Sequence, residues 1–251
     1  MRAAGRTLVV TGAGGDIGRA VTLEALRRGA RVAAVDADPV ALRATAAQAV
    51  SANALSIHEA DLTDRAAVRE LPARIIARWA QIDGVLHCAG TAQPVAPLAD
   101  LDDETIDRVF AVNWSGTLHV SRAFLPVLRT RPEAHLVTVA SLGGVLPVPG
   151  QTVYGAAMAA VRLLTEGLHA ECAGTNVRVT LALPPAPLPG AATTTPERAA
   201  RDILTGMERN AYRILLGRDA RLMDRLYRLT PRRAVTLLTT HLRRLSAAPA
   251  R

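Results

Sequence analysis

Short apolar runs alternate with longer stretches of helical periodicity along most of this chain. The apolar runs, rich in Val, Ile and Leu, predict strands at 7–11, 31–35, 54–58, 82–87, 135–140, 177–183 and 212–216. Apolar positions three and four residues apart predict helices at 17–28, 39–50, 65–79, 103–128 and 152–172. Strict alternation of the two kinds of element is typical of a parallel sheet with helices on both faces. We therefore expect one doubly wound α/β domain, with a mostly parallel seven-stranded sheet and a core spanning 6–216.

The remaining segment, 217–251, has a different pattern. Leucines recur at helical spacing and arginines stand between them, with an interruption at Pro231. This predicts a C-terminal extension of two basic amphipathic helices. Two interpretations stay open: the helices pack on the domain or on a subunit partner, or they contact an anionic membrane surface peripherally.

Composition narrows the class of protein. The 251 residues contain no visible repeat or linker, which predicts a single domain, and with 3% aromatic residues the core must consist largely of Ala, Val and Leu. The net charge is +8, and every basic residue that contributes to it is an arginine. The arginines are spread along the chain and are not interleaved with aromatic residues, so we expect no nucleic-acid partner. Two cysteines form neither a disulfide framework nor a metal motif. The first strand follows the N-terminus closely and no apolar stretch is long enough to span a bilayer, so we expect a cytoplasmic protein.

A glycine-rich turn carries the first chemical signal. Thr11-Gly12-Ala13-Gly14-Gly15-Asp16-Ile17-Gly18 follows the first predicted strand and opens a helix, which is the context in which such a turn binds a pyrophosphate. Asp36 ends the second strand, where an acid can accept hydrogen bonds from a ribose and repel a 2′-phosphate. These residues predict a site for NAD rather than NADP. The Asp16 carboxylate would either oppose the pyrophosphate or turn away and bond helix N–H groups.

Together with further motifs, this turn resembles the short-chain dehydrogenase/reductase family over about residues 6–216. The family carries T-G-x-x-x-G-x-G, an acid after the third strand, Asn-Asn-Ala-Gly after the fourth, an Asn in the long helix, and a Ser followed by Tyr-x-x-x-Lys. The matching residues here are Thr11, Gly12, Gly18, Asp61, Ala89, Gly90, Asn113, Ser141 and Tyr154.

The resemblance implies a Rossmann-type fold and a role for each matching residue. Tyr154 would be the general acid or base, Ser141 would position the carbonyl oxygen, and Asn113 would anchor a proton-relay water. Cofactor contacts are implied for Thr11, Gly12, Gly14, Gly15, Asp16, Ile17, Gly18, Asp36, Asp61, Leu62, Cys88, Ala89, Gly90 and Pro184.

Four places depart from the family pattern. One is Asp16, which occupies the middle glycine position of the turn. Met158 stands where the family has the lysine that favours tyrosinate, so we expect Tyr154 to titrate near 10 and to remain protonated. His87-Cys88 replaces two asparagines, so the hydrogen bonds that steady this turn must be remade. The loop beginning Pro184-Pro185 lacks the family's Gly and Thr, which predicts a short, stiff lid.

The sequence thus predicts an NAD(P)(H)-dependent oxidoreductase acting on a carbonyl or secondary alcohol of a small apolar metabolite, with catalysis impaired or altered by Met158. Two alternatives remain open. One is a non-redox acid–base enzyme that catalyses a dehydration, cyclisation or isomerisation, with Tyr154 as the acid. The other is a catalytically inactive dinucleotide-binding protein. Assembly into a homo-oligomer is implied only by the resemblance.

Overall fold

Seven parallel strands form one continuous sheet. The computed structural model describes residues 1–185 and 194–247. The strand order is β3-β2-β1-β4-β5-β6-β7, and every neighbouring pair is parallel. The strands are β1 Thr7–Thr11, β2 Arg31–Asp36, β3 Leu55–Glu59, β4 Gly84–His87, β5 Ala134–Val139, β6 Val177–Leu183 and β7 Arg213–Leu215. The order reverses between β1 and β4, so the expected doubly wound fold is confirmed.

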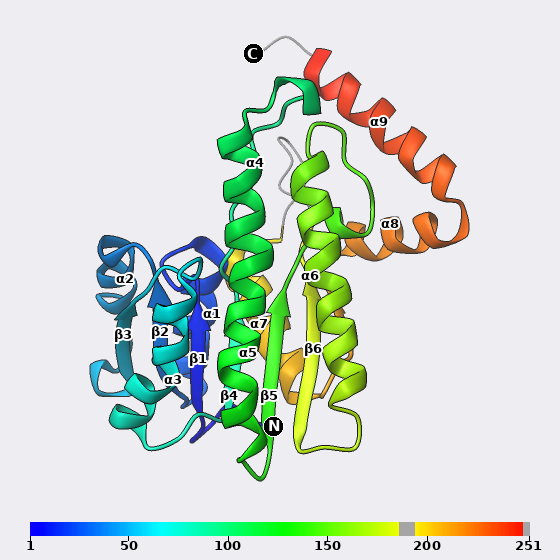
Figure 1. Ribbon diagram of the computed structural model, residues 1–251. Helices are drawn as coiled ribbons and strands as arrows, with labels where there is room; N and C mark the ends of the chain where they lie inside the picture. The colour runs from blue at the N-terminus through cyan, green and yellow to red at the C-terminus, as the bar shows by residue number, and fades with distance from the viewer. Residues whose placement is uncertain (186–193, 248–251) are drawn as a thin grey trace.

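Helices cover both faces of this sheet (Figure 1). They are α1 Asp16–Arg27, α2 Pro39–Ala46, α3 Arg65–Trp79, α4 Asp103–Phe110, α5 Gly116–Arg129, α6 Thr152–Glu171, α7 Pro196–Glu208, α8 Arg218–Leu229 and α9 Pro231–Ala247. One face is packed by α1 and α7, which contact each other, and the other by α3, α5 and α6. Short 3₁₀ turns lie at η1 Ala52–Ala54, η2 Leu98–Asp100 and η4 Leu142–Gly144.

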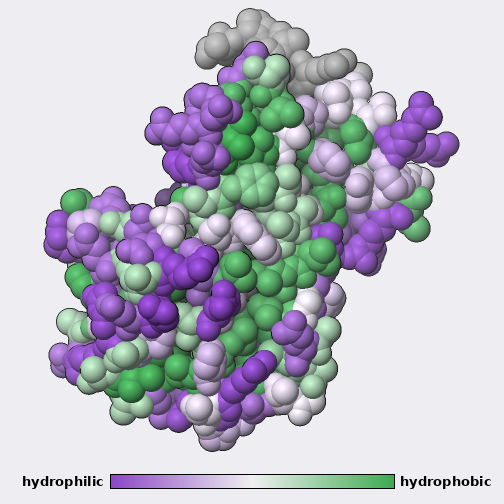
Figure 2. Space-filling view, in the orientation of Figure 1, coloured by the Kyte–Doolittle hydropathy of each residue, from purple (hydrophilic) through white to green (hydrophobic). Residues whose placement is uncertain are grey.

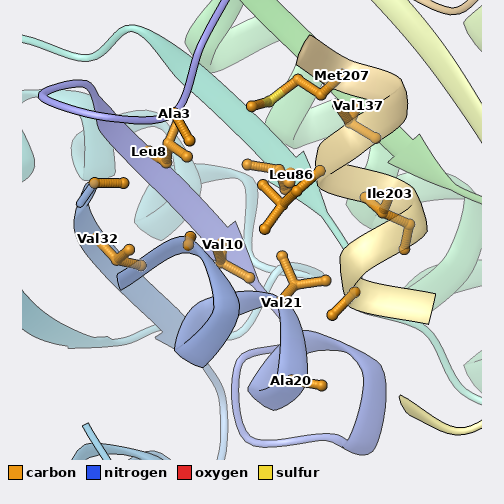
Figure 3. Packing of buried hydrophobic residues seen from close by; sticks show 14 of the residues in the cluster. Ala3, Leu8, Val10, Ala20, Val21, Val32, Leu86, Val137, Ile203 and Met207 are labelled. Carbon is orange, nitrogen blue, oxygen red and sulfur yellow. The ribbon is translucent and has the colours of Figure 1, made fainter. Parts of the chain in front are cut away.

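Small aliphatic side chains fill the space between the layers. On the α1–α7 face, Leu8 and Val10 of β1 meet Val21 of α1 and Ile203 of α7, all fully buried (Figure 3). Phe124 is the largest side chain that is completely excluded from solvent among the described residues. The expected core of Ala, Val and Leu is confirmed, and its small side chains bring the helices close to the sheet.

Two helices differ from the expected pattern. The helix expected at 39–50 ends at Ala46, because the N–H groups of Gln48 and Ala49 bond three residues back and tighten the chain into a turn. The helix expected at 103–128 is continuous, but a π-helical turn, η3 Ala111–Ser115, interrupts its regular geometry between α4 and α5. Single π-helical turns inside α-helices are frequent at functional sites.

The C-terminal extension consists of two helices that meet at Pro231. Thr230 has a non-helical backbone, as the residue before a proline tends to, and Pro231 occupies the first position of α9. The expected break is confirmed. Within 1–185 and 194–247, no helix is both long and apolar enough to cross a membrane.

Candidate active site

A cleft of about 660 Å³ lies at the carboxyl ends of the strands. Its walls come from the loops after β1, β2, β3 and β4, from the first two turns of α6, and from Pro184 and Pro185 after β6. These loops are far apart in sequence and meet where the strand order reverses, which is the usual ligand position in an open α/β sheet. The volume is within the range of small-molecule and cofactor sites.

The glycine turn after β1 is shaped by close approach to its neighbours. Gly12 has a φ of +67°, and a Cβ there would lie 2.6 Å from the backbone of Ala89. A Cβ on Gly18 would lie 2.0 Å from the carbonyl oxygen of Gly12. Only glycine fits both positions, and the bare backbone leaves the amino end of α1 open to the cleft. A helix amino end with free N–H groups is suited to bind a pyrophosphate.

Carboxylates dominate the charge of this cleft. Asp16, Asp36, Asp38 and Asp61 all line it, and no arginine or histidine does so in the part of the chain that the structure describes. Asp36 is held in place, since its Oδ2 accepts from the Gly14 N–H at 2.8 Å and its Oδ1 from the Asp38 N–H at 3.0 Å. None of the described hydrogen bonds is accepted by the exposed Asp16 carboxylate, so it does not turn back to cap its own helix. The cleft therefore presents a negative field to any ligand.

Ser141 and Tyr154 lie next to each other, close enough for the Ser141 side chain to act on the pKa of the Tyr154 phenol. Tyr154 lines the cleft, and Ser141 is buried directly behind it. Ser141 follows β5, and its Oγ also accepts from the Gly143 N–H at 3.1 Å. Tyr154 lies in the first turn of α6, where its backbone N–H donates to Oε1 of Gln93 at 2.7 Å. Gln93 is buried and donates in turn to the Gly150 carbonyl at 2.8 Å, so it fixes the start of α6. Nothing in the sequence pattern pointed to Gln93.

Burial raises the pKa of Tyr154, and the hydrogen bond with Ser141 offsets only part of that rise. The expectation of an unshifted pKa near 10 is therefore wrong, because the pKa of Tyr154 is raised. The cause is that the phenol is 7% exposed and the next turn of α6 presents Met158, which is 4% exposed and uncharged. At neutral pH the phenol keeps its proton.

Asn113 lies behind the cleft wall, in the π-helical turn. Its Oδ1 accepts from the Thr91 N–H at 3.0 Å, and its Nδ2 donates to the Thr91 carbonyl at 2.8 Å. This pair of bonds pins the loop after β4. A Cβ on the neighbouring Gly90 would lie 2.9 Å from the Asn113 Oδ1.

His87, at one of the two positions where the family has asparagine, forms a hydrogen bond through each of its ring nitrogens. The Thr117 hydroxyl donates to the Asn113 carbonyl at 2.5 Å, so its oxygen accepts from Nε2–H of His87 at 2.9 Å. Nδ1 of His87 then accepts from the Thr11 hydroxyl at 2.7 Å. Burial lowers the pKa of His87 to about 4, so the ring stays neutral and joins β1 and β4 to the helix that carries Asn113.

Cys88 lines the cleft next to this histidine. Burial raises the pKa of its thiol to about 12, so it carries no thiolate at neutral pH. A neutral thiol is a poor nucleophile, and Cys88 acts here as a small apolar wall residue.

Most of the residues singled out from the sequence do line this cleft, but Thr11, Asn113 and Ser141 lie buried behind its wall. Pro184 lines the cleft, and its carbonyl oxygen accepts a hydrogen bond from the Leu142 N–H at 2.8 Å. This bond ties the end of β6 to the loop after Ser141. The lid expected after Pro185 lies mostly at 186–193, outside the described residues. Lining residues that the sequence did not indicate are Ala37, Asp38, Ala41, Ala60, Thr63, Thr91, Ala92, Val112, Val139, Ala140 and Pro185.

Comparison with known proteins places these features in context. Residues 6–199 match the sequence profile described as short chain dehydrogenase. The chain is 30% identical over 252 residues to SadH of Mycobacterium tuberculosis, covering 90% of this chain and 91% of that protein. It is 30% identical over 185 residues to the 3-oxoacyl-acyl-carrier-protein reductase FabG of Thermotoga maritima, covering 73% and 75% of the two chains.

A similar fold occurs in a solved short-chain dehydrogenase/reductase from Burkholderia phymatum, crystallised in complex with NAD. The two structures superpose with a TM-score of 0.81 at 21% identity, over 92% of this chain and 96% of the other.

Proposed function

The chain belongs to the short-chain dehydrogenase/reductase family, and from this premise we propose that it is an NAD(H)-dependent oxidoreductase that reduces the carbonyl group of a small apolar metabolite. The observation that carries the proposal is the placement of Tyr154 in a glycine-lined cleft with Ser141 beside it. Met158 makes reduction the favoured direction.

The glycine turn supports the assignment of a dinucleotide. Gly12, Gly14 and the amino end of α1 would hold the pyrophosphate, and the fixed Asp36 carboxylate would accept hydrogen bonds from the adenosine ribose. Asp61 and Leu62 would lie beside the adenine ring. When bound, NADH supplies the hydride for carbonyl reduction.

The four cleft carboxylates favour NAD over NADP. A 2′-phosphate on the ribose would lie near Asp36 and Asp38, with no arginine in the described lining to neutralise it. Two like charges about 4 Å apart repel by roughly 1 kcal/mol in water and by about 4 kcal/mol near a protein surface. Even the pyrophosphate has to bind against this field, so the helix amino end must supply most of its attraction.

Tyr154 and Ser141 would carry out the proton chemistry. The substrate carbonyl oxygen would accept hydrogen bonds from both hydroxyls, and the Tyr154 phenol would give up its proton as the oxygen gains negative charge. The raised pKa of Tyr154 keeps that proton in place at neutral pH. Alcohol oxidation needs the tyrosinate instead, and with Met158 no adjacent cation stabilises it.

The walls around this pair favour an apolar substrate. Val112, Val139, Ala140, Met158 and Pro185 line the same cleft as Tyr154, and Ala140 and Met158 belong to the same apolar cluster as Tyr154. None of them carries a charge or a side-chain donor, so a polar or ionised substrate would lose hydration there without gaining a partner.

Two measurements test the proposal. Fluorescence titration of the intact chain with NADH and NADPH should show tighter binding of NADH. NADH-dependent reduction of a panel of small ketones should fall by about 10²- to 10⁴-fold in Tyr154→Phe while NADH binding is retained. Tyr212→Phe, at a tyrosine that is 48% exposed and does not line this cleft, is the matched control and should leave the rate unchanged. Absence of NADH binding, or a full rate in Tyr154→Phe, would refute the proposal.

A further inference from the structure

The outward face of α8 exposes leucines to solvent. Leu222 is 66% exposed and Leu229 is 82% exposed. They are seven residues apart, which places them on the same side of the helix. Single exposed leucines are common on protein surfaces, so this stripe gains meaning only together with the charge beside it.

The inward face of α8 is fixed to the body, so this exposure is not an accident of a loosely placed helix. Ala220 is 1% exposed and Asp224 is 5% exposed. The Asp224 carboxylate forms an ion pair with Arg213 of β7 at 2.9 Å and another with Arg228 at 3.0 Å. Burial of Ala220 and the ion pair with Arg213 set the rotation of the helix and turn Leu222 and Leu229 outward.

Arginines lie along one side of the exposed leucines, where those of α8 line an open hollow of about 730 Å³ between α8, α7 and β7. Arg221, Arg225 and Arg228 lie on α8, and Arg232 and Arg233 follow in the first turn of α9; all five are exposed. Between residues 220 and 240 the only acid is Asp224, which is buried. Among the described residues, Arg221 and Arg225 have no ion-pair partner. The surface therefore combines a leucine stripe with a concentrated positive charge.

We propose that this surface, formed by the leucine stripe of α8, the arginines beside it at the rim of the hollow and the first turn of α9, and called here the α8 face, docks onto an anionic lipid bilayer. Leu222 and Leu229 would enter the interfacial region while the arginines bind headgroup phosphates. A second copy of the chain is a poor occupant, because a symmetric contact would bring the same arginines against each other. The proposal does not depend on the enzymatic activity.

The position of the α8 face agrees with an apolar substrate. Figure 1 shows α8 and α9 beside the carboxyl end of the sheet, the end at which the cleft lies, and in Figure 2 hydrophilic and hydrophobic residues adjoin at this edge. Docking through the α8 face would hold that end of the molecule near the bilayer, in which an apolar carbonyl compound would be concentrated.

Vesicle sedimentation of the full-length chain tests the proposal. The probes are vesicles of phosphatidylcholine alone and of phosphatidylcholine with about one third phosphatidylglycerol. Binding is expected only to the anionic vesicles, and it should weaken strongly between 50 mM and 500 mM NaCl. Arg221→Gln with Arg225→Gln should reduce the partition coefficient about 30-fold, on the basis of about 1 kcal/mol per arginine. Leu222→Ser with Leu229→Ser should reduce it at least tenfold.

Two double variants serve as matched controls. Arg69→Gln with Arg122→Gln removes the same charge from other exposed sites, and Val40→Ser with Val50→Ser removes exposed apolar groups elsewhere. Both should bind anionic vesicles as the parent does. Equal binding by all four variants, or no preference of the parent for anionic vesicles, would overturn the proposal. So would analytical ultracentrifugation showing that the Leu222→Ser, Leu229→Ser variant converts a dimer to a monomer, because the α8 face would then join two copies of the chain.

Discussion

Placing a cation beside Tyr154 is the sharpest test of how this site works, and Met158→Lys does so with one substitution. Met158 is 4% exposed and one helical turn beyond Tyr154 on α6. Its Cε lies 3.8 Å from where a Cβ on Gly90 would stand, so the side chain points along the cleft wall toward the loop after β4. A lysine there would place its ammonium close to the Ser141–Tyr154 pair.

The expected effect follows from the ionisation of Tyr154. An opposite charge within about 4–6 Å lowers the pKa of a neighbouring acid by about 1–3 units. Each unit raises the tyrosinate fraction at pH 7 about tenfold, so alcohol oxidation should accelerate by about 10- to 1,000-fold in Met158→Lys. At saturating substrate, the turnover number for ketone reduction should change less than tenfold at pH 7, because most molecules still hold the phenolic proton. The equilibrium constant of the reaction is fixed, so the difference between the two directions must appear as compensating changes in KM.

The assay is the pH profile of oxidation and reduction between pH 6 and 10.5, with Met158→Leu as the uncharged control of similar volume. The midpoint of the oxidation profile should move to lower pH in Met158→Lys and stay in place in Met158→Leu. If both variants fold and bind NADH but share the parent's profile, the argument that the missing cation controls Tyr154 is wrong.

Three further predictions follow from the site. Asp36→Asn should improve NADPH affinity relative to NADH affinity by about tenfold in fluorescence titrations. Higher salt should tighten NADPH binding to the parent, because repulsion between like charges is then screened. An unchanged ratio of the NADPH and NADH affinities in Asp36→Asn would contradict this. Gly18→Ala should lower the free energy of unfolding in urea by at least about 1 kcal/mol and weaken NADH binding, because its Cβ would lie 2.0 Å from the Gly12 carbonyl oxygen. A Cβ at Gly167 would have nothing within 4 Å, so the control Gly167→Ala should stabilise its helix by about 0.5–1 kcal/mol. The pKa of His87 is about 4 in the folded protein and near 6.5 in the unfolded chain. The contribution of the neutral ring to stability is therefore full above pH 6.5, and up to about 3 kcal/mol of it is lost as the pH falls to 4. Urea unfolding at several pH values should show a smaller loss of stability in His87→Asn than in the parent.

The order and type of the elements could be predicted from the sequence because they depend on local patterns. The strand at 7–11 and the helix at 65–79 have the expected bounds, since a continuous apolar run and a 3.6-residue period identify them. Asp64 supports the latter helix by accepting hydrogen bonds from its first N–H groups. The glycine turn and the Ser141 and Tyr154 pair could be identified for the same reason, because a turn or a helix start fixes their local surroundings.

Contacts between distant segments were decided only by the tertiary structure. Gln93 reaches Tyr154 from a loop about 60 positions earlier, and His87 bonds Thr117 on a helix, so neither role has a local signature. The shift in the pKa of Tyr154 arises from burial by several elements together, which no spacing reveals. In the same way, the leucine period at 222–229 predicted an amphipathic helix, but only the ion pair between Asp224 and Arg213 determined that the leucines face outward.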